Sequence, residues 1–151
     1  MDTIPLHRDF GVEVQGISLV DEHLPEMYPA LRDLFERHSL LLFRDQDFTE
    51  VAHMSLARLF GPVEDRYDRP EPEISPVTNL SDDGTVVSAV WDHRLVNLQA
   101  NFLWHTDSTF LPTPALANIL VARVLPSHGG NTEYVSTRAG FSRLPEETRT
   151  R

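Results

Sequence analysis

Apolar residues recur at helical spacing in two segments of the first half of the chain, residues 25–39 and 49–60. In each segment the apolar positions fall on one face of a helix, and most charged positions fall on the other. The Gly61-Pro62 pair after the second segment is typical of a helix end. The pattern therefore predicts two amphipathic helices, whose apolar faces carry Tyr28, Leu31, Phe35 and His38 in the first and Ala52, Leu56, Leu59 and Phe60 in the second.

Other segments have the pattern of strands. Residues 10–19 alternate loosely between apolar and polar and predict an early strand that ends in a turn. Residues 40–43 form a short apolar run, as expected of a strand that is buried on both faces. Residues 116–125, rich in Ile, Leu and Val, are the best strand candidate in the chain, and residues 132–136 alternate again after a turn at 128–131.

The amino-acid composition changes in the middle of the chain. Residues 63–97 are rich in proline and charge and predict a long loop, which is typical of a lid or mobile segment or else of a plain surface loop. Within it, residues 77–80 favour a strand and residues 81–84 a turn. Near the end, residues 138–144 look helical, and Pro145 followed by Glu146 and Glu147 opens a further helix.

Composition narrows the class of protein. The chain has 151 residues, of which 40% are hydrophobic and 24% charged, and this describes one soluble globular domain. The formal net charge of -10 argues against non-specific nucleic-acid binding, which needs a basic surface. A small anionic molecule remains a possible partner, provided that cationic side chains are gathered locally.

Cysteine is absent, which excludes disulfides, thiolate metal sites and a cysteine nucleophile, so any metal must be held by His, Asp or Glu. The strongly apolar runs are far shorter than the roughly 20 residues that a membrane helix needs. The first residues carry neither a basic segment nor an apolar one of the kind found in signal peptides. We therefore expect a cytoplasmic protein with no membrane partner.

The most specific chemistry lies in the segment Trp104-His105-Thr106-Asp107-Ser108-Thr109-Phe110. If this segment is extended, residues two apart point to the same side, so that His105 and Asp107 can converge on one metal ion. They would supply two of the three ligands of a 2-His-1-carboxylate iron site. The bulky Trp104 and Phe110 on either side are expected to exclude water from it.

The His-x-Asp spacing alone is weak support for a metal site. It occurs a second time at His7-Arg8-Asp9, which we interpret as an exposed surface segment. The alternative interpretation of the first pair is a partly buried histidine that hydrogen-bonds to a neighbouring aspartate. Four further histidines carry no ligand signature: His38, His53, His93 and His128. No Gly-x-Ser-x-Gly elbow or glycine-rich phosphate loop is present.

Several motifs together resemble one family. The 104–110 segment and the following Gly129-Gly130-Asn131-Thr132-Glu133-Tyr134 are similar to the taurine dioxygenase and phenoxyacetate-herbicide dioxygenase (TauD/TfdA) family of Fe(II)- and 2-oxoglutarate-dependent oxygenases. Residues 41–46 and 59–62 resemble the N-terminal half of that family in the same order. The resemblance covers essentially the whole chain, and residues 1–151 would be the N-terminal portion of a single dioxygenase domain.

The resemblance implies a fold and a site. The fold would be α+β or mainly β: part of a double-stranded β-helix (jelly-roll) barrel with flanking helices, here truncated. His105 and Asp107 match the first two iron ligands, and Thr132 matches a threonine that hydrogen-bonds the distal carboxylate of 2-oxoglutarate. Asn101 matches a position that lines the substrate pocket, whereas Trp104 is assigned to packing.

The implied activity is the hydroxylation of a small anionic substrate, of the sulfonate or aryloxyalkanoate type, with Fe(II), 2-oxoglutarate and O₂ and with succinate and CO₂ as co-products. A homo-oligomer is expected. The family's second histidine and the arginine that pairs with 2-oxoglutarate lie downstream of the Gly-Gly-x-Thr motif, beyond Arg151. The chain as written therefore holds two of the three iron ligands.

Two other hypotheses remain open at this point. The chain would be a truncated, non-catalytic remnant that acts as a structural or interaction module, in which case unpaired strands should promote self-association. Alternatively, it would be a zinc hydrolase that uses His105, Asp107 and a distant histidine.

Overall fold

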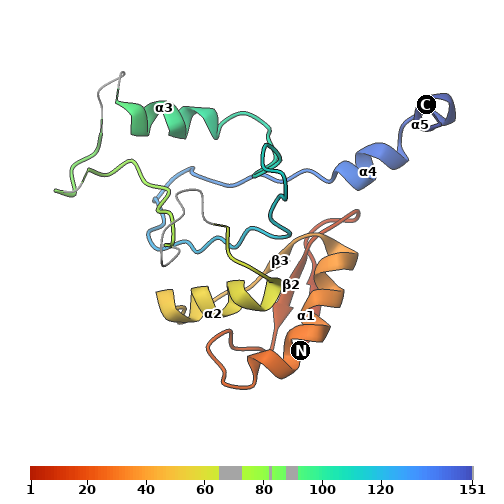
Figure 1. Cartoon of the computed structure of the whole chain (residues 1–151), viewed down its shortest axis with the longest axis horizontal. Helices are drawn as coiled ribbons and strands as arrows, with labels where there is room; N and C mark the ends of the chain where they lie inside the picture. The colour runs from red at the N-terminus through yellow and green to blue at the C-terminus, as the bar shows by residue number, and fades with distance from the viewer. Residues whose placement is uncertain (65–72, 82, 88–91, 151) are drawn as a thin grey trace. The chain divides into compact units, whose positions relative to one another are not determined.

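The computed structural model describes all residues except 65–72, 82, 88–91 and 151 (Figure 1). The contacts divide the chain into two compact units. The first unit comprises Met1–Phe60 and Ile119–Arg151, and the second comprises Gly61–Asn118. The helices are α1 (Leu24–His38), α2 (Glu50–Phe60), α3 (His93–Ala100), α4 (Thr137–Ser142) and α5 (Glu146–Arg149), and the strands are β1 (Asp2–Pro5), β2 (Val12–Gln15) and β3 (Leu41–Leu42).

The three strands of the first unit form a small mixed sheet in the order β1-β2-β3. β1 pairs antiparallel with β2, and β2 pairs parallel with β3, where Val12 lies opposite Leu41. The predicted strand at 10–19 is confirmed in β2, whose Val12 and Val14 point into the core. The predicted strand at 40–43 is confirmed in β3. The prediction that this strand is buried on both faces is wrong, because β3 is an edge strand and residues 40–43 are half-buried.

Both predicted amphipathic helices are confirmed. Helix α1 ends at Ser39, whose left-handed backbone (φ 63°) lets its N–H donate to the Phe35 carbonyl at 2.7 Å. Helix α2 begins after Thr49, whose hydroxyl accepts from the Ala52 N–H at 3.2 Å. The ring of Phe60 at the end of α2 meets the rings of Tyr28 and Phe35 edge-on, with centroids 5.2 and 5.8 Å apart, and so holds the two helices together.

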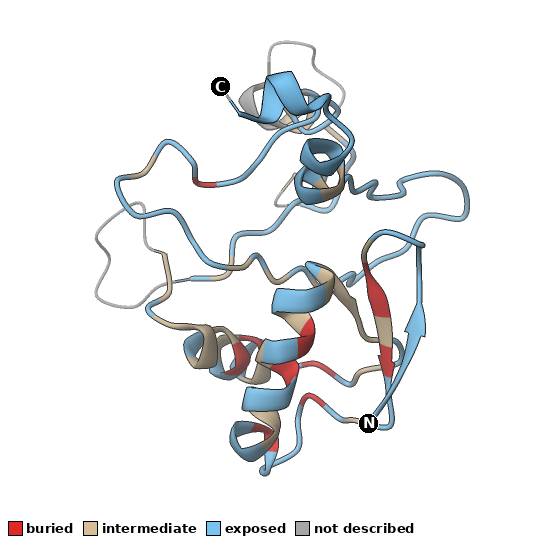
Figure 2. Cartoon of the chain, turned by 90° about the vertical axis from the view of Figure 1, so that its right-hand side faces the viewer, coloured by how far each residue is buried: buried red, intermediate tan, exposed pale blue. Residues whose placement is uncertain are grey.

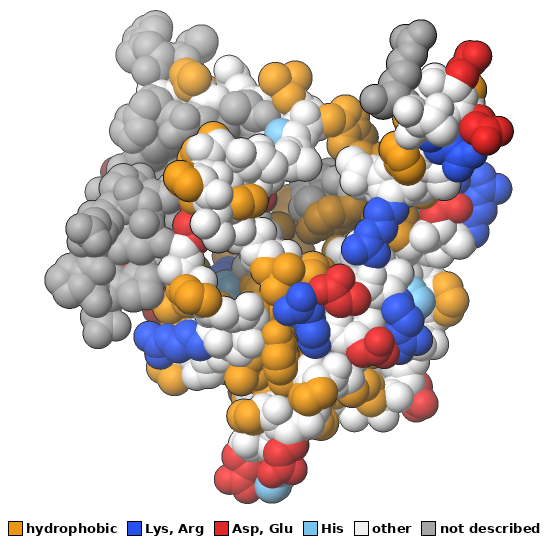
Figure 3. Space-filling view, turned by 45° about the vertical axis from the view of Figure 1, so that its right-hand side comes forward, with side chains coloured by type: hydrophobic (Ala, Val, Ile, Leu, Met, Phe, Trp, Pro, Cys, Tyr) orange, Lys and Arg blue, Asp and Glu red, His pale blue; other side chains and the backbone are white. Residues whose placement is uncertain are grey.

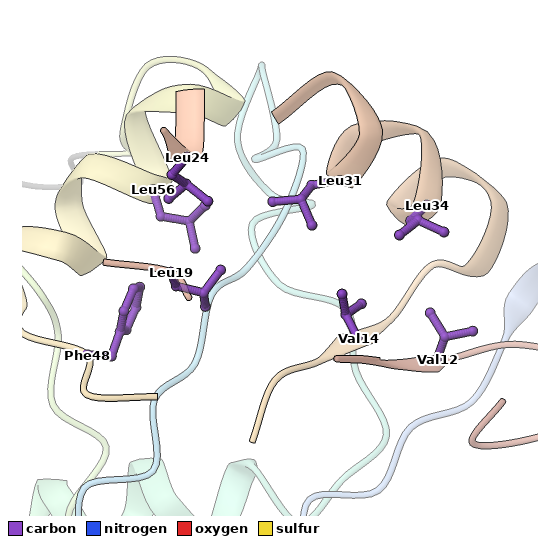
Figure 4. Close-up of a cluster of buried hydrophobic side chains, with 8 residues drawn as sticks. All are labelled: Val12, Val14, Leu19, Leu24, Leu31, Leu34, Phe48 and Leu56. Carbon is purple, nitrogen blue, oxygen red and sulfur yellow. The ribbon is translucent and has the colours of Figure 1, made fainter. Parts of the chain in front are cut away.

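The buried apolar core belongs to the first unit and joins α1, α2 and the sheet (Figure 2). Figure 4 shows Leu31 and Leu34 of α1 directed toward Val14 and Val12 of β2. The eight buried apolar side chains of the described residues are Val12, Val14, Leu19, Leu24, Leu31, Leu34, Phe48 and Leu56.

The segment that begins at Ile119 returns to this core. His53 in α2 is buried and its Nε2 donates to the Ile119 carbonyl at 3.0 Å, while a guanidinium N–H of Arg123 donates to the Phe48 carbonyl. Ile119 and Val121 pack against the core, whereas Leu120 between them is exposed. The alternation that predicted a strand at 116–125 is thus visible in the side chains. The prediction of a strand is wrong for the described residues, because no neighbouring backbone among them pairs with this segment.

The remaining predicted elements agree with the structure only in part. Residues 132–136 carry no strand pairing, and residues 77–80 contribute only the isolated bridge between Leu80 and Val86. The turn at 81–84 is confirmed by the Gly84 N–H, which donates to the Ser81 carbonyl at 2.8 Å. Helix α3 and strand β1 were missed, whereas α4 and α5 match the predicted helical segments near the end of the chain. The α+β expectation is confirmed, although α1 alone is longer than the three strands together.

No helix among the described residues has both the length and the apolar character required to cross a membrane. On the face drawn in Figure 3, Arg side chains adjoin Asp and Glu side chains. Within α1, Arg32 pairs with Glu36 and Arg37 pairs with Asp33, each one helical turn apart. Such exposed pairs contribute little to stability, because water and dissolved salt screen their charges.

Two arginines fasten the α4 segment to the rest of the first unit. Arg138 donates to the Glu36 carbonyl near the end of α1, at 2.6 Å, and Arg143 donates to the carboxylate of Asp9. The exposure expected for the His7-Arg8-Asp9 segment is confirmed, but Asp9 also has a structural partner that the sequence pattern did not indicate.

Asp9→Asn is expected to remove part of the acid sensitivity of folding. The Arg143 hydrogen bond, with the charges of Arg143, Arg8 and His7, lowers the pKa of Asp9 below its usual value of 3.8 against a weaker opposing effect of burial. Because the folded pKa is the lower one, this stabilisation is present above pH 3.8 and is lost as the pH falls through the folded pKa.

Urea unfolding checks this prediction. The midpoints of the wild type and the variant should differ at about pH 6 and converge at about pH 2. Asp2→Asn, the same change at an exposed carboxylate of β1, is the control and should show no such convergence. A difference for Asp9→Asn that stays constant with pH would contradict the assignment.

Candidate metal site

The candidate metal ligands lie in the second unit, just after helix α3. The Asn101 and Phe102 N–H groups donate to Leu98 and Gln99 carbonyls at 3.1 Å and so end the helix in a turn. The segment that follows bends and is not a strand, so the expected strand geometry at 104–110 is wrong. Its two candidate ligands nevertheless come together: Nε2 of His105 lies 3.4 Å from Oδ1 of Asp107.

His105 is held by its other ring nitrogen. Nδ1 lies 2.7 Å from the Leu103 carbonyl oxygen, and because a carbonyl oxygen only accepts hydrogen bonds, Nδ1 is the donor. In the neutral ring this leaves the lone pair on Nε2, the atom that faces Asp107. A histidine fixed in this way by a backbone carbonyl is typical of metal ligands, since the contact sets both the tautomer and the ring direction.

Asp107 has a different partner on each oxygen. Oδ1 faces His105, and Oδ2 accepts a hydrogen bond from Nδ2 of Asn118 at 2.5 Å. A cation between the Nε2 lone pair and the carboxylate oxygen would bind to both, and a protonated imidazole would pair with the carboxylate directly. The arrangement is therefore compatible with a shared cation and with a direct histidine–aspartate pair.

The backbone turn next to Asp107 is fixed separately. Ser108 adopts a left-handed conformation (φ 59°), uncommon for a residue other than glycine, and its carbonyl accepts from the Leu111 N–H at 3.0 Å. Its side chain is buried, and the hydroxyl donates to the carboxylate of Glu64. This contact holds the strained position, which would otherwise be costly for serine.

The distance between the two donor atoms fits a shared ion. Metal–ligand bonds of about 2.1 Å at roughly right angles place adjacent donor atoms about 3 Å apart. The observed 3.4 Å is close to this separation. Within the described part of the chain, no group of three or more His, Asp or Glu side chains could hold a metal. His105 and Asp107 thus stay a predicted pair of ligands, whose donor atoms the structure brings close together.

The shielding that was expected from the aromatic neighbours is wrong for the described residues. Trp104 is 67% exposed and Phe110 is 70% exposed. The side chains of His105 and Asp107 are themselves about half exposed, at 46% and 51%. The two donors are therefore ordered by hydrogen bonds, not by a dry aromatic enclosure.

The other two predicted site residues lie in different units. Asn101 is exposed and directly follows α3, in the same unit as His105. Thr132 is exposed in the first unit, two residues after Gly130. The two glycines before it have a backbone that favours glycine: Gly129 and Gly130 both have φ of 69°, and a Cβ on Gly130 would lie 2.8 Å from Cγ of Pro126.

Sequence reasoning missed Asn118, Glu64 and the role of Ser108. Asn118 lies 11 residues after Asp107, and Glu64 lies 44 residues before Ser108, so neither forms a recognisable local motif. The positive φ of Ser108 also has no sequence signal, because glycine, Asn or Asp is the usual residue there.

Comparison with known proteins supplies the context for this site. Residues 2–151 match the family described as "Taurine catabolism dioxygenase TauD, TfdA family". The chain is 33% identical to the (S)-phenoxypropionate/alpha-ketoglutarate-dioxygenase of Sphingobium herbicidovorans, over 99% of this chain and 50% of that protein. It is 34% identical to the alpha-ketoglutarate-dependent 2,4-dichlorophenoxyacetate dioxygenase of Cupriavidus pinatubonensis, over 95% of this chain and 52% of that protein.

A more distant relative and a solved structure agree with this match. The alpha-ketoglutarate-dependent sulfate ester dioxygenase of Pseudomonas putida is 29% identical over 99% of this chain and 46% of that protein. The crystal structure of AAD-2 in complex with Mn(II) and N-oxalylglycine superposes with a TM-score of 0.82 and 30% identity, over 99% of this chain and 51% of that one. The chain thus spans about half the length of the relatives that it matches.

Proposed function

Because the chain belongs to the TauD, TfdA family of dioxygenases, we propose that the protein is an Fe(II)- and 2-oxoglutarate-dependent dioxygenase that hydroxylates a small anionic substrate. The observation that carries the proposal is the facing pair of donor atoms, His105 Nε2 and Asp107 Oδ1, at 3.4 Å. The names of the relatives support the cosubstrate, since three of them include alpha-ketoglutarate.

The residues of this chain have distinct roles in the proposal. His105 and Asp107 hold the iron, and the Leu103 carbonyl and the Asn118 amide keep them directed toward it. Thr132 donates its hydroxyl to the distal carboxylate of 2-oxoglutarate, and Asn101 lines the substrate pocket. When bound, the iron supplies the chemistry that couples O₂ to the oxidation of 2-oxoglutarate and of the substrate.

The proposal extends to the whole domain. Residues 1–151 form the N-terminal portion of one double-stranded β-helix domain, in which the segments at 116–125 and 132–136, unpaired among the described residues, pair with strands of the remainder. The third iron ligand, a histidine, and the arginine that pairs with 2-oxoglutarate come from the remainder of that domain. Support comes from the match to about half of the AAD-2 chain, which was solved with Mn(II) and N-oxalylglycine, an analogue of 2-oxoglutarate with NH in place of one CH₂.

The substrate class follows from what the relatives have in common. Their names specify phenoxypropionate, 2,4-dichlorophenoxyacetate and sulfate esters, each of which combines an anionic group with a carbon bonded to oxygen. For an aryloxy acid, one atom of O₂ enters the C–H bond beside the ether oxygen and the other enters succinate as CO₂ leaves. The resulting hemiacetal breaks its C–O bond, giving a phenol and a carbonyl acid.

The first test of this proposal is spectroscopic. Anaerobic addition of Fe(II) and 2-oxoglutarate to the full-length protein is expected to produce a visible charge-transfer band, which should require both additions. A folded protein that gives no band would contradict the iron and 2-oxoglutarate assignment. Tight zinc binding with O₂-independent hydrolysis would instead support the zinc hydrolase.

Turnover then identifies the substrate type. The loaded enzyme is assayed for succinate formation with an aryloxypropionate, an aryloxyacetate, an alkyl sulfate and taurine. We expect one of these anions to raise succinate formation well above the substrate-free rate, with one phenol, sulfate or sulfite released per succinate. A band without stimulation by any of the four would contradict the substrate class and leave the cosubstrate assignment intact.

A further inference from the structure

The carboxylate of Asp107 is bound on the side away from His105 by a residue outside the His-x-Asp motif. Nδ2 of Asn118 donates to Oδ2 at 2.5 Å, while Oδ1 faces Nε2 of His105 at 3.4 Å. We propose that Asn118 is a positioning residue for the metal site, which selects the Asp107 rotamer that presents Oδ1 to the ion. This inference rests on the proposed function, because it assigns the ion to the same site.

The need for such a residue follows from the exposure of Asp107. Its side chain is 51% exposed, so packing alone does not restrict its two torsions. A hydrogen bond to an ionised carboxylate is stronger than one between neutral groups, and here it fixes one oxygen in place. The other oxygen is then directed to His105 before any ion arrives, which reduces the ordering that binding requires.

The chemistry of an amide suits this task. A lysine or arginine at position 118 would also hold Oδ2, but its positive charge would compete with the metal ion for the carboxylate. The neutral amide donates a hydrogen bond and leaves the full negative charge of Asp107 available to the ion. His105 is held in a matching way by the neutral Leu103 carbonyl, so each donor has its own uncharged support.

The backbone of the ligand segment is fixed by a separate contact. The Ser108 hydroxyl donates to Glu64, which secures the turn immediately after Asp107. The turn determines where the Asp107 backbone lies, and Asn118 determines where its carboxylate points. A change at Asn118 is therefore expected to affect metal affinity without unfolding the segment.

The test measures Mn(II) binding to the full-length protein by electron paramagnetic resonance, which counts free and bound ion without any turnover. Asn118→Ala is expected to weaken Mn(II) binding about 10-fold to 100-fold, as found for other residues that orient metal ligands. Asn118→Leu, which keeps the size of the side chain and removes the amide, should show the same loss. The metal-free melting temperature should stay within about 2 °C for both variants, because residue 118 is exposed.

Two controls separate the possible outcomes. Asn79→Ala, the same change at another exposed position of the second unit, should leave the affinity unchanged, and His105→Ala should abolish specific binding. Wild-type affinity in Asn118→Ala or Asn118→Leu would overturn the positioning role alone. Wild-type protein that binds Mn(II) no better than His105→Ala would overturn the proposed metal site and this inference with it.

Discussion

His105→Ala is expected to lower the affinity for Fe(II) or Mn(II) by more than about 100-fold and to abolish the charge-transfer band with 2-oxoglutarate. Loss of a residue that only orients a ligand costs about 10-fold to 100-fold in metal affinity, and loss of the ligand itself should exceed that range. His105 is suited to be a ligand because its Nδ1–H donates to the Leu103 carbonyl, which leaves the lone pair of the neutral ring on Nε2, facing Asp107.

The chain contains a matched control in His7, the histidine of its other His-x-Asp motif. There, Nδ1 accepts a hydrogen bond from the Asp9 N–H at 3.2 Å, and the Asp9 carboxylate is already paired with Arg143 and lies 3.7 Å from Nε of Arg8. Positive charge beside a carboxylate disfavours a metal ion there. His7→Ala should therefore retain wild-type affinity and band intensity.

Isothermal titration with Mn(II) and anaerobic absorption spectra measure these two quantities. The His105→Ala protein must also be shown to melt at a temperature close to that of the wild type, since its side chain is 46% exposed and should contribute little to folding. Equal metal affinity in His105→Ala and wild-type protein would rule out His105 as a ligand. If His105→Ala and His7→Ala lose the same metal affinity and band intensity, the different hydrogen-bond partners of the two histidines do not determine which one binds the metal.

Leu31→Ala is expected to lower the free energy of unfolding by about 2–5 kcal/mol. Leu31 is 1% exposed and points from α1 toward the sheet, where Val14 lies opposite (Figure 4). Truncation removes buried methyl groups and leaves a cavity that the β-branched side chain of Val14 cannot fill by changing rotamer. The loss would be a large fraction of the 5–15 kcal/mol that is typical of domains.

Chemical unfolding of the full-length protein, monitored by far-ultraviolet circular dichroism, measures this change. Val51→Ala on α2 is the control, because Val51 is 77% exposed and the change should stay within about 0.5 kcal/mol. A cost below about 1 kcal/mol for Leu31→Ala would mean that α1 does not pack on the sheet as described.

The elements that depend on local pattern were predictable from the sequence. Helices α1 and α2 each display one apolar face, and Ser39 and Gly61 end them with positive φ angles. The strand predicted at 116–125 was wrong because apolar alternation specifies which side chains turn inward, whereas a strand also needs a paired backbone. Helix α3 was missed because it has only eight residues and follows a proline-rich, charged stretch that predicted a loop.

The candidate site was also predictable only in the part that depends on local sequence. The His-x-Asp spacing indicated that His105 and Asp107 act together, and their donor atoms do face one another. The sequence could not show that a bend replaces the expected strand, because that bend depends on the contact between Ser108 and Glu64 from a distant segment. The contact of Asn118 with Asp107 could not be predicted either, since an asparagine next to an apolar run can hydrogen-bond to many different groups.

The distribution of buried side chains along the chain has a consequence for biosynthesis. Among the described residues, every buried apolar side chain lies between Val12 and Leu56. At a synthesis rate of about 5–20 residues per second, His105 and Asp107 are added several seconds after the last of these residues. A nascent chain can therefore bring α1, α2 and the sheet together before its candidate metal ligands are translated, and Ile119 and Val121 join that core only afterwards.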